Sequence, residues 1–267
     1  MSGALAMALL RRRLPGLLAW VMGLVLYEWL LAALYPSLGR SPAYGHLIAT
    51  LPPALLHAFG VSAGRPSFGT FMAGEVFSLV WALALAYRLA DAGASLIAGL
   101  MERGPLQLIL SLPLSRRAFI ATAALLVLVE AAGLVVGSVG GLWLLAAAYH
   151  LPLAGRGVVV LAAEGFALLA SVGAVALLGS AAASAERAAL SWAMAWVIIE
   201  YVANLAASLD THLHWAAHLS VFSDFQAKAA LAASSWHPVA LTGGPLVVAA
   251  AALAGAAWWF NQRQLAI

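Results

Sequence analysis

The sequence predicts an all-α integral membrane protein with six transmembrane helices. Of the 267 residues, 64% are hydrophobic and only 9% are charged, whereas a soluble domain carries about 25% charged residues to keep its surface hydrated. The mean hydropathy is +0.98. The apolar residues fall in runs of about 20 or more, the length that crosses ~30 Å of hydrocarbon. We therefore expect a single transmembrane domain over residues 1–267.

The first span is expected at residues 14–35, directly after the basic run at residues 11–13. This apolar run is too long for a signal peptide, so we interpret it as a retained span. Residues 2–10 are expected to form a short interfacial helix before it. The other five spans are expected at 68–90, 118–148, 157–184, 188–208 and 239–260.

The basic residues predict the orientation. With the N-terminus inside, nine Lys and Arg residues lie on the inner side and four on the outer side, and an excess of these residues marks the cytoplasmic side. We therefore expect a multi-pass protein of the cell inner (plasma) membrane with both termini in the cytoplasm. The inner nine are Arg11, Arg12, Arg13, Arg88, Arg103, Arg116, Arg117, Arg187 and Arg263; the outer four are Arg40, Arg65, Arg156 and Lys228.

Two outer segments, 36–67 and 209–238, are too long for simple turns. In the first, Pro52-Pro53 can open a short helix with an apolar face. In the second, Ser223 and Gln226 have the spacing of a capping box. We expect interfacial or re-entrant helices before spans two and six, and whether their apolar faces cap the outer mouth or rest on lipid stays open.

The third span carries Gly133, Gly137 and Gly141 at four-residue spacing. Glycines on one stripe let another helix backbone approach closely. Packing inside one subunit is the favoured interpretation, ahead of a dimer interface.

The inner loop, residues 91–117, holds an amphipathic segment. The chain breaks at Gly104-Pro105 and a short helix is expected to follow, with Leu106, Ile109 and Leu110 on one face. An apolar ridge flanked by Glu102 and Arg103 is suited to a groove on a partner protein. An interfacial helix lying on lipid is the alternative.

These motifs resemble those of the permease subunits of ABC transporters, in the type-2, exporter-like class. The family pattern is an acidic residue, an arginine and a glycine, then a leucine-rich helix ending in S-L-P-x-S-R. This chain has Glu102-Arg103-Gly104 and then LQLILSLPLSR over residues 106–116. Further similarity lies in LPPALLHAFG (51–60), FMAGEVFSL (71–79) and WWFNQRQL (258–265).

The resemblance implies a non-catalytic membrane subunit that pairs as a homodimer or heterodimer. Separate ATPase subunits, which bind ATP and Mg, would drive it from the inner loop. The residues that would couple to the ATPase are Glu102, Arg103, Leu106, Ile109 and Leu110. A P-loop needs a lysine followed by Ser or Thr, and the only lysine, Lys228, precedes Ala229. No cofactor is therefore expected on this chain, and no nucleic-acid partner.

Five carboxylates lie inside the expected spans. A carboxylate inside a membrane is energetically costly and typically faces a cavity or a partner group. No Arg or Lys is expected at their depth, so each would be protonated, hydrogen-bonded or bound to a cation. A structural role and a shared surface for a cation or cationic substrate both stay open. Glu130 is expected to lie deepest; the four candidates for a transport path are Glu28, Glu75, Glu164 and Glu200.

The sequence bears on three other interpretations. His212, His214 and His218 have a spacing that can bind a metal ion, but no carboxylate ligand lies in register, so no metal site is assigned. A secondary, ion-coupled transporter could use the intramembrane carboxylates, but no inverted repeat is evident. An intramembrane enzyme of the rhomboid type would need G-x-S-x-G and a histidine within the spans, and neither occurs.

Overall fold

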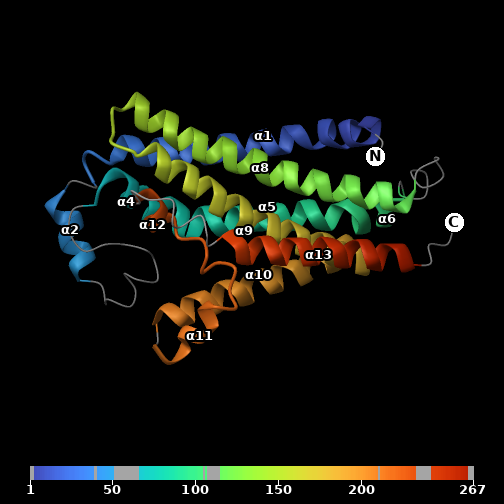
Figure 1. Ribbon diagram of the computed structural model, residues 1–267. Coiled ribbons are helices and arrows are strands. Elements are labelled where there is room, and N and C mark those ends of the chain that lie inside the picture. The colour runs from blue at the N-terminus through green and yellow to red at the C-terminus, as the bar shows by residue number, and fades with distance from the viewer. Residues whose placement is uncertain are drawn as a thin grey trace.

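The computed structural model describes residues 3–38, 41–50, 66–104, 106, 115–209, 211–232 and 242–263. Within these ranges the ordered elements are all helices. Six of the helices are long and apolar enough to cross a membrane, as the sequence predicts. They run roughly parallel as one elongated bundle, with both termini at the same end (Figure 1).

The first span is α1 (Gly3–Leu34), a single helix that continues through Pro15. The separate interfacial helix expected at 2–10 is therefore not present, because residues from Gly3 onward continue directly into the span. The third, fourth and fifth spans are α8 (Arg116–Ala148), α9 (Gly155–Ala182) and α10 (Glu186–Leu209), and the sixth is α13 (Gly243–Gln262).

The second span is a composite helix over Phe68–Glu102, longer than the expected 68–90. Residues 91–102 therefore extend the helix rather than opening the inner loop. Two of its five segments are π-helical, a geometry that is rare and frequently found at functional sites. The segments are α4 (Phe68–Met72), η1 (Ala73–Trp81), α5 (Ala82–Ala94), η2 (Ser95–Gly99) and α6 (Leu100–Glu102).

At the end opposite the termini lie the short helices α2 (Pro42–Ala49), η3 (Thr211–Leu213), α11 (His214–Ala217) and α12 (Ala227–Ala232) (Figure 1). The prediction of a capping box at Ser223 and Gln226 is wrong. Ser223 donates its hydroxyl to the carbonyls of Ala217 and Ser220, and α12 begins only after Gln226. The Pro52-Pro53 helix lies outside the described residues.

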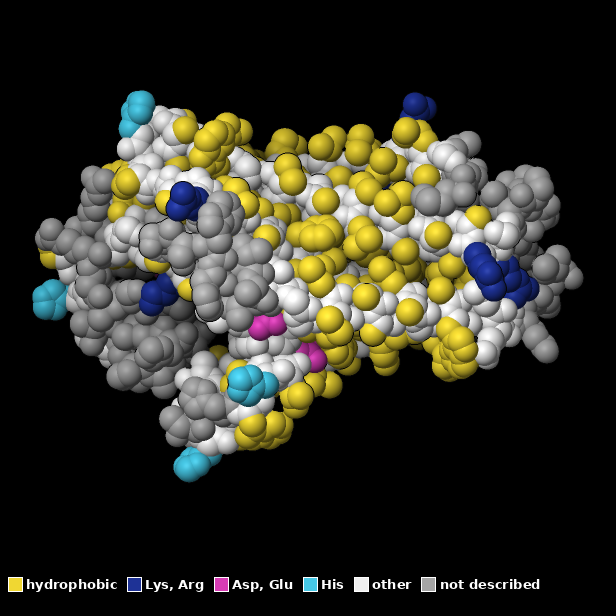
Figure 2. Space-filling view, in the orientation of Figure 1, with side chains coloured by type: hydrophobic (Ala, Val, Ile, Leu, Met, Phe, Trp, Pro, Cys, Tyr) yellow, Lys and Arg dark blue, Asp and Glu magenta, His cyan; other side chains and the backbone are white. Residues whose placement is uncertain are grey.

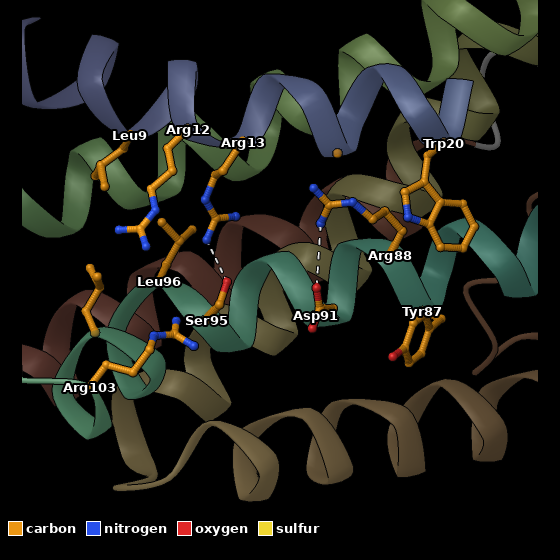
Figure 3. Close-up of a pocket in the computed structure, with 12 residues that line it drawn as sticks. Leu9, Arg12, Arg13, Trp20, Tyr87, Arg88, Asp91, Ser95, Leu96 and Arg103 are labelled. Atoms are coloured by element: carbon orange, nitrogen blue, oxygen red, sulfur yellow. Dashed lines mark hydrogen bonds and ion pairs between the residues drawn. The ribbon is translucent and has the colours of Figure 1, made fainter. Parts of the chain in front are cut away.

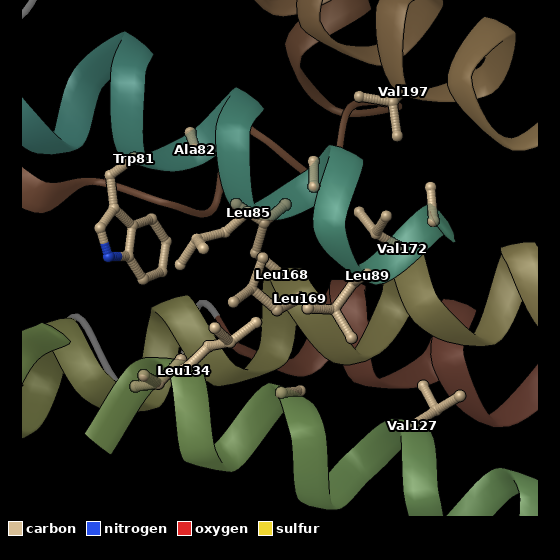
Figure 4. Close-up of a cluster of buried hydrophobic side chains, with 14 of the residues drawn as sticks. Trp81, Ala82, Leu85, Leu89, Val127, Leu134, Leu168, Leu169, Val172 and Val197 are labelled. Atoms are coloured by element: carbon tan, nitrogen blue, oxygen red, sulfur yellow. The ribbon is translucent and has the colours of Figure 1, made fainter. Parts of the chain in front are cut away.

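Helix α9 forms the centre of the bundle. It packs against α5, α8, α10 and α13, and it is the most buried of the six spans. Its small residues allow this close packing; a Cβ at Gly165, for example, would lie 2.7 Å from the Trp81 ring. Figure 4 shows Leu85 and Leu89 of α5 meeting Leu168 and the neighbouring α9 side chains in this core.

Helix α9 also holds the π-helical segment η2 in place. The hydroxyl of Ser180 accepts hydrogen bonds from the backbone amides of Ile97 and Ala98, at 3.2 and 2.8 Å, and donates one to the carbonyl of Ala94 at 2.6 Å. A π-helical turn shifts the backbone pairing, and this one side chain satisfies three of the groups around it.

The glycine stripe of the third span packs inside the subunit, as predicted. A Cβ at Gly133, Gly137 or Gly141 of α8 would lie 2.5 to 3.1 Å from the side chains of Leu17, Val21 and Val25 of α1, respectively. The α1 residues repeat every fourth position and so form one ridge that fits over the glycines.

The surface has the pattern of a membrane protein. Figure 2 shows hydrophobic side chains over the middle of one face and Lys and Arg side chains toward the two ends. Helices α1 and α10 bury few of their side chains and expose many apolar ones, including Met22 and Leu26 on α1 and Ile198 and Ile199 on α10. Such continuous apolar exposure is expected where a helix faces lipid or another subunit.

Candidate functional site

At the end of the bundle that carries the termini, which the sequence predicts to be the inner end, the composite second span is attached to the start of the fifth. A carboxylate oxygen of Glu102 accepts a 2.7 Å hydrogen bond from the backbone amide of Glu186, the first residue of α10. The Arg103 guanidinium lies 2.5 Å from the Glu186 carboxylate. Gly99 makes room for this contact, because a Cβ there would lie 2.6 Å from the Arg103 side chain. We call Glu102, Arg103 and Glu186 the inner junction.

The last described residue, Arg263, binds the turn between spans four and five from the α9 side. Arg263 donates hydrogen bonds to the carbonyls of Ala181 and Ala183, at 2.9 and 2.7 Å, at the C-terminus of α9. A cation suits this position because the last carbonyls of a helix lack partners and carry partial negative charge. The connection between spans four and five is therefore fixed from both sides.

The predicted coupling residues are only partly described. Glu102 and Arg103 are exposed and belong to the inner junction. Leu106 is 2% exposed and packs in this chain's own core, which differs from the displayed position expected of it. Ile109 and Leu110 lie outside the described residues, so the ridge they would form remains a prediction.

Glu130 has two basic partners that the sequence did not reveal. It lies 2.8 Å from Arg13 of α1 and 2.7 Å from Arg88 of α5. The expectation that no arginine is available to these carboxylates is wrong for Glu130. The helices explain the error: α1 begins before Arg13, and the second span continues well past Arg88, so both arginines lie within helices and can face the same carboxylate.

This ion cluster joins three helices. Besides Glu130, Arg13 donates to the carbonyl of Ala92 at 3.2 Å and to the hydroxyl of Ser95 at 2.6 Å. Glu130 is fully buried, and the two arginine side chains are 17% and 10% exposed. Burying a charged group away from water is costly unless the group has a close partner of opposite charge. The cluster supplies such a partner for each of its three charged groups.

Two of the predicted transport-path carboxylates bind the segment between α11 and α12, which the sequence predicts to be outer. Glu164 of α9 accepts a 3.0 Å hydrogen bond from the backbone amide of Gln226, just before α12. The carboxylate of Glu200 in α10 accepts a 2.9 Å hydrogen bond from the backbone amide of Val221. The backbone carbonyl of Glu200 accepts another from the hydroxyl of Ser220. These contacts favour the hydrogen-bonded, structural alternative for Glu164 and Glu200.

The other two carboxylates differ from this pair. Glu28 is fully buried against α8, and neither of its oxygens has a hydrogen-bond partner among the described residues. Glu75 lies in the π-helical segment η1, where its carbonyl accepts a 3.2 Å hydrogen bond from Tyr27. Among the described ranges, no three His, Asp or Glu side chains gather closely enough to hold a metal ion.

A polar cavity of about 360 Å³ lies beside the segment before α12, at the end of the bundle opposite the termini. Its floor is formed in part by Phe225, which stacks on Trp81 at 5.2 Å, and the Trp81 indole donates a 2.9 Å hydrogen bond to Ser138. Helices η1 and α10 form its walls. The polar side chains that line it are Ser78, Tyr201, Asn204, Ser208, Ser223, Gln226 and Lys228. Sequence reasoning missed this cavity because its walls come from three distant segments.

No family model, no curated protein and no solved structure matches this chain. The chain is a multi-pass helical membrane protein. The inner junction lies at one end of the bundle and the polar cavity at the other, and α10 contributes residues to both.

Proposed function

We propose that this chain is the permease subunit of an ATP-driven transporter of the ABC type, an exporter. It pairs with a second permease subunit and receives energy from separate ATPase chains at its inner loop. The motif at Glu102-Arg103-Gly104 is the sequence basis of the proposal, and the inner junction is the structural observation that supports it most strongly.

A transporter driven from outside its own chain needs a mechanical path from the inner surface to the substrate path. The inner junction ties the residues before the inner loop directly to the first turn of α10. Farther along the same helix, Glu200 binds the outer segment, and Tyr201 and Asn204 line the outer cavity. Force applied to the inner loop would thus reach the outer end through one rigid helix of about 36 Å, at ~1.5 Å per residue.

The second candidate is an ion-coupled secondary transporter, and Glu28 is the observation that favours it. A buried carboxyl with no hydrogen-bond partner among the described residues is suited to binding and releasing a cation. Replacing Glu28 by Gln keeps its size and removes that ability. The ABC proposal expects ATP-dependent transport to persist in this variant, whereas the ion-coupled alternative expects transport to stop.

The proposal is tested by purifying the tagged chain from its native membrane in a mild detergent. We expect a second chain with a P-loop to copurify in a stable ratio and the complex to hydrolyse ATP. A chain that purifies without an ATPase and transports under an ion gradient alone would contradict the proposal.

The proposed orientation has its own test, because the chain contains no cysteine. Single cysteines at Ser41, Ser111 and Ser234 can be treated with an impermeant thiol reagent in intact cells. We expect labelling at positions 41 and 234 and none at 111. Labelling at 111 alone would reverse the orientation and place the inner loop outside, away from ATP.

A further inference from the structure

A strongly basic cavity of about 490 Å³ lies between α1 and the inner half of the second span. Four guanidinium groups line it: those of Arg12 and Arg13 from α1, Arg88 from α5, and Arg103 directly after the end of the second span. Asp91 is the one carboxylate among the lining residues. Figure 3 shows Arg12, Arg13 and Arg88 reaching into the space between the two helices, with Arg103 at the end of the second span.

Three of the four guanidiniums are already partnered within the chain. Glu130 forms ion pairs with Arg13 and Arg88, and Glu186 forms one with Arg103. Asp91 lies 3.9 Å from Arg88 and is half exposed. Arg12 is exposed and makes no ion pair or hydrogen bond with any described residue. The cavity therefore offers one uncompensated guanidinium at its rim and a net positive charge.

An apolar groove of about 380 Å³ adjoins the cavity at Trp20 and lies nearer the middle of the bundle. Trp20 lines both spaces, and beyond it the walls are apolar, with Gly23 and Leu24 of α1 facing Val80 and Ala84 of the second span. Within the groove, from Ala19 to Tyr27, the helix rises about 12 Å at ~1.5 Å per residue. One leaflet of hydrocarbon is about half of ~30 Å, so the groove is long enough for most of one acyl chain.

A positive charge beside an apolar groove matches an amphiphile with an anionic head. We infer that the groove between α1 and the second span binds an anionic phospholipid, with the phosphate at Arg12 and an acyl chain between Trp20 and Tyr27. Basic cavities between transmembrane helices commonly bind anionic head groups. This inference goes beyond the proposed function and does not depend on an ATPase partner.

Two other occupants fit less well. A free phosphate ion would satisfy Arg12 but would leave the apolar groove beyond Trp20 unfilled. A second copy of this chain, packed by two-fold symmetry, would bring the same uncompensated Arg12 toward a face that is already positive. Charge and shape together favour the lipid.

The head-group contact is tested by native mass spectrometry of the full-length protein in detergent. The probes are phosphatidylglycerol and phosphatidylcholine with identical acyl chains. We expect preferential retention of phosphatidylglycerol, weakened about fivefold by Arg12→Gln, the factor that corresponds to about 1 kcal/mol per basic residue at a membrane surface. Arg11→Gln is the matched control, because Arg11 is exposed on the same helix but does not line the cavity. Equal retention of the two lipids, or an equal effect of both variants, would overturn the inference.

The tail contact is tested by filling the groove. A Cβ at Gly23 meets nothing within 4 Å and Gly23 lines the groove, so Gly23→Leu adds its side chain from an open position. We expect this variant to lose phosphatidylglycerol, whereas Gly140→Leu, at an equally open position on α8, retains it. Retention by Gly23→Leu, or release of the lipid by millimolar inorganic phosphate, would show an anion site without a lipid tail. Disulfide-linked dimers of an Ala19→Cys variant in native membranes would show that a second copy fills the groove, and would also overturn the inference.

Discussion

The backbone amide of Glu186 donates a 2.7 Å hydrogen bond to the carboxylate of Glu102, a residue 84 positions earlier in the chain. The last residue of the second span is therefore hydrogen-bonded to the first residue of the fifth span. Glu186 also pairs with Arg103 through its side chain. Two neighbouring residues at the end of the second span therefore bind the first residue of α10, one at its backbone amide and the other at its carboxylate.

Arg103→Ala should separate transport from stability. Both partners of the pair are accessible to water, and such pairs contribute about 0–1 kcal/mol, so the melting temperature should change little. We expect ATP-dependent transport to fall severalfold because α10 loses its connection to the loop. The measurement is transport in reconstituted vesicles beside thermal unfolding in detergent.

Arg117→Ala is the matched control for this variant. Arg117 is exposed near the same end, and no hydrogen bond or ion pair of its side chain to a described residue is found. Equal transport by the two variants would mean that the inner junction does not transmit force.

The buried ion cluster should be costly to break and tolerant of complete replacement. Glu130→Ala leaves the Arg13 and Arg88 guanidiniums without their shared carboxylate, and removing one member of a buried pair typically costs about 3–5 kcal/mol. We expect a large fall in the yield and thermal stability of this variant.

Replacing all three residues, with Arg13→Met, Arg88→Met and Glu130→Leu together, should recover much of the loss, because no unpaired charge then remains buried. A triple variant less stable than Glu130→Ala would show that the cluster contributes more than mutual neutralisation.

The contact between α1 and α8 predicts opposite outcomes for two neighbouring glycines. A Cβ at Gly137 would lie 2.5 Å from Val21, whereas a Cβ at Gly140 meets nothing within 4 Å. Gly137→Ala should therefore lower stability by about 1–3 kcal/mol through overpacking, and Gly140→Ala should be neutral or slightly stabilising. Thermal unfolding of both variants in one detergent gives the comparison, and similar values would contradict the packing.

Asp224, outside the six spans, should give a pH-dependent contribution to stability. Burial raises the pKa of this carboxyl above its ordinary value of 3.8, and the hydrogen bond with Ser223 acts in the opposite direction. The folded state thus binds the proton more tightly than the unfolded state does, so the ionised group destabilises the fold. This penalty is absent below 3.8 and develops as the pH rises through the raised pKa.

Asp224→Asn should therefore be more stable than the wild type at neutral pH, and the difference should disappear as the pH falls toward 3.8. Melting temperatures of both proteins across pH 3.8 to neutral test this sign. An advantage of the variant that grows on acidification would contradict it.

The sequence predicted the features that depend on local pattern. Apolar runs located the six spans, and the four-residue spacing of Gly133, Gly137 and Gly141 located a helix contact inside the subunit. Both follow from the length and periodicity of a helix, which can be counted along the chain.

The sequence did not predict features that depend on how distant helices are placed. The partners of Glu130 come from two other spans, and finding them requires the length and rotation of each helix. The amides held by Glu164 and Glu200 belong to an irregular outer segment whose course no local pattern indicates. The capping-box prediction failed at Ser223 for the same reason, since Glu164 of a different helix binds the amide at Gln226.

The most direct test of the proposed function is ATP hydrolysis by the complex purified through this chain, compared between the wild type and Leu110→Asp. A buried leucine contributes roughly 1.5–3 kcal/mol by transfer from water, so a charge at this position of the predicted ridge should disrupt an ATPase contact. We predict that Leu110→Asp remains inserted in the membrane but loses the ATPase chain, or keeps it without coupling hydrolysis to transport. Full copurification, hydrolysis and transport in Leu110→Asp would contradict the assignment of the inner loop as the coupling element.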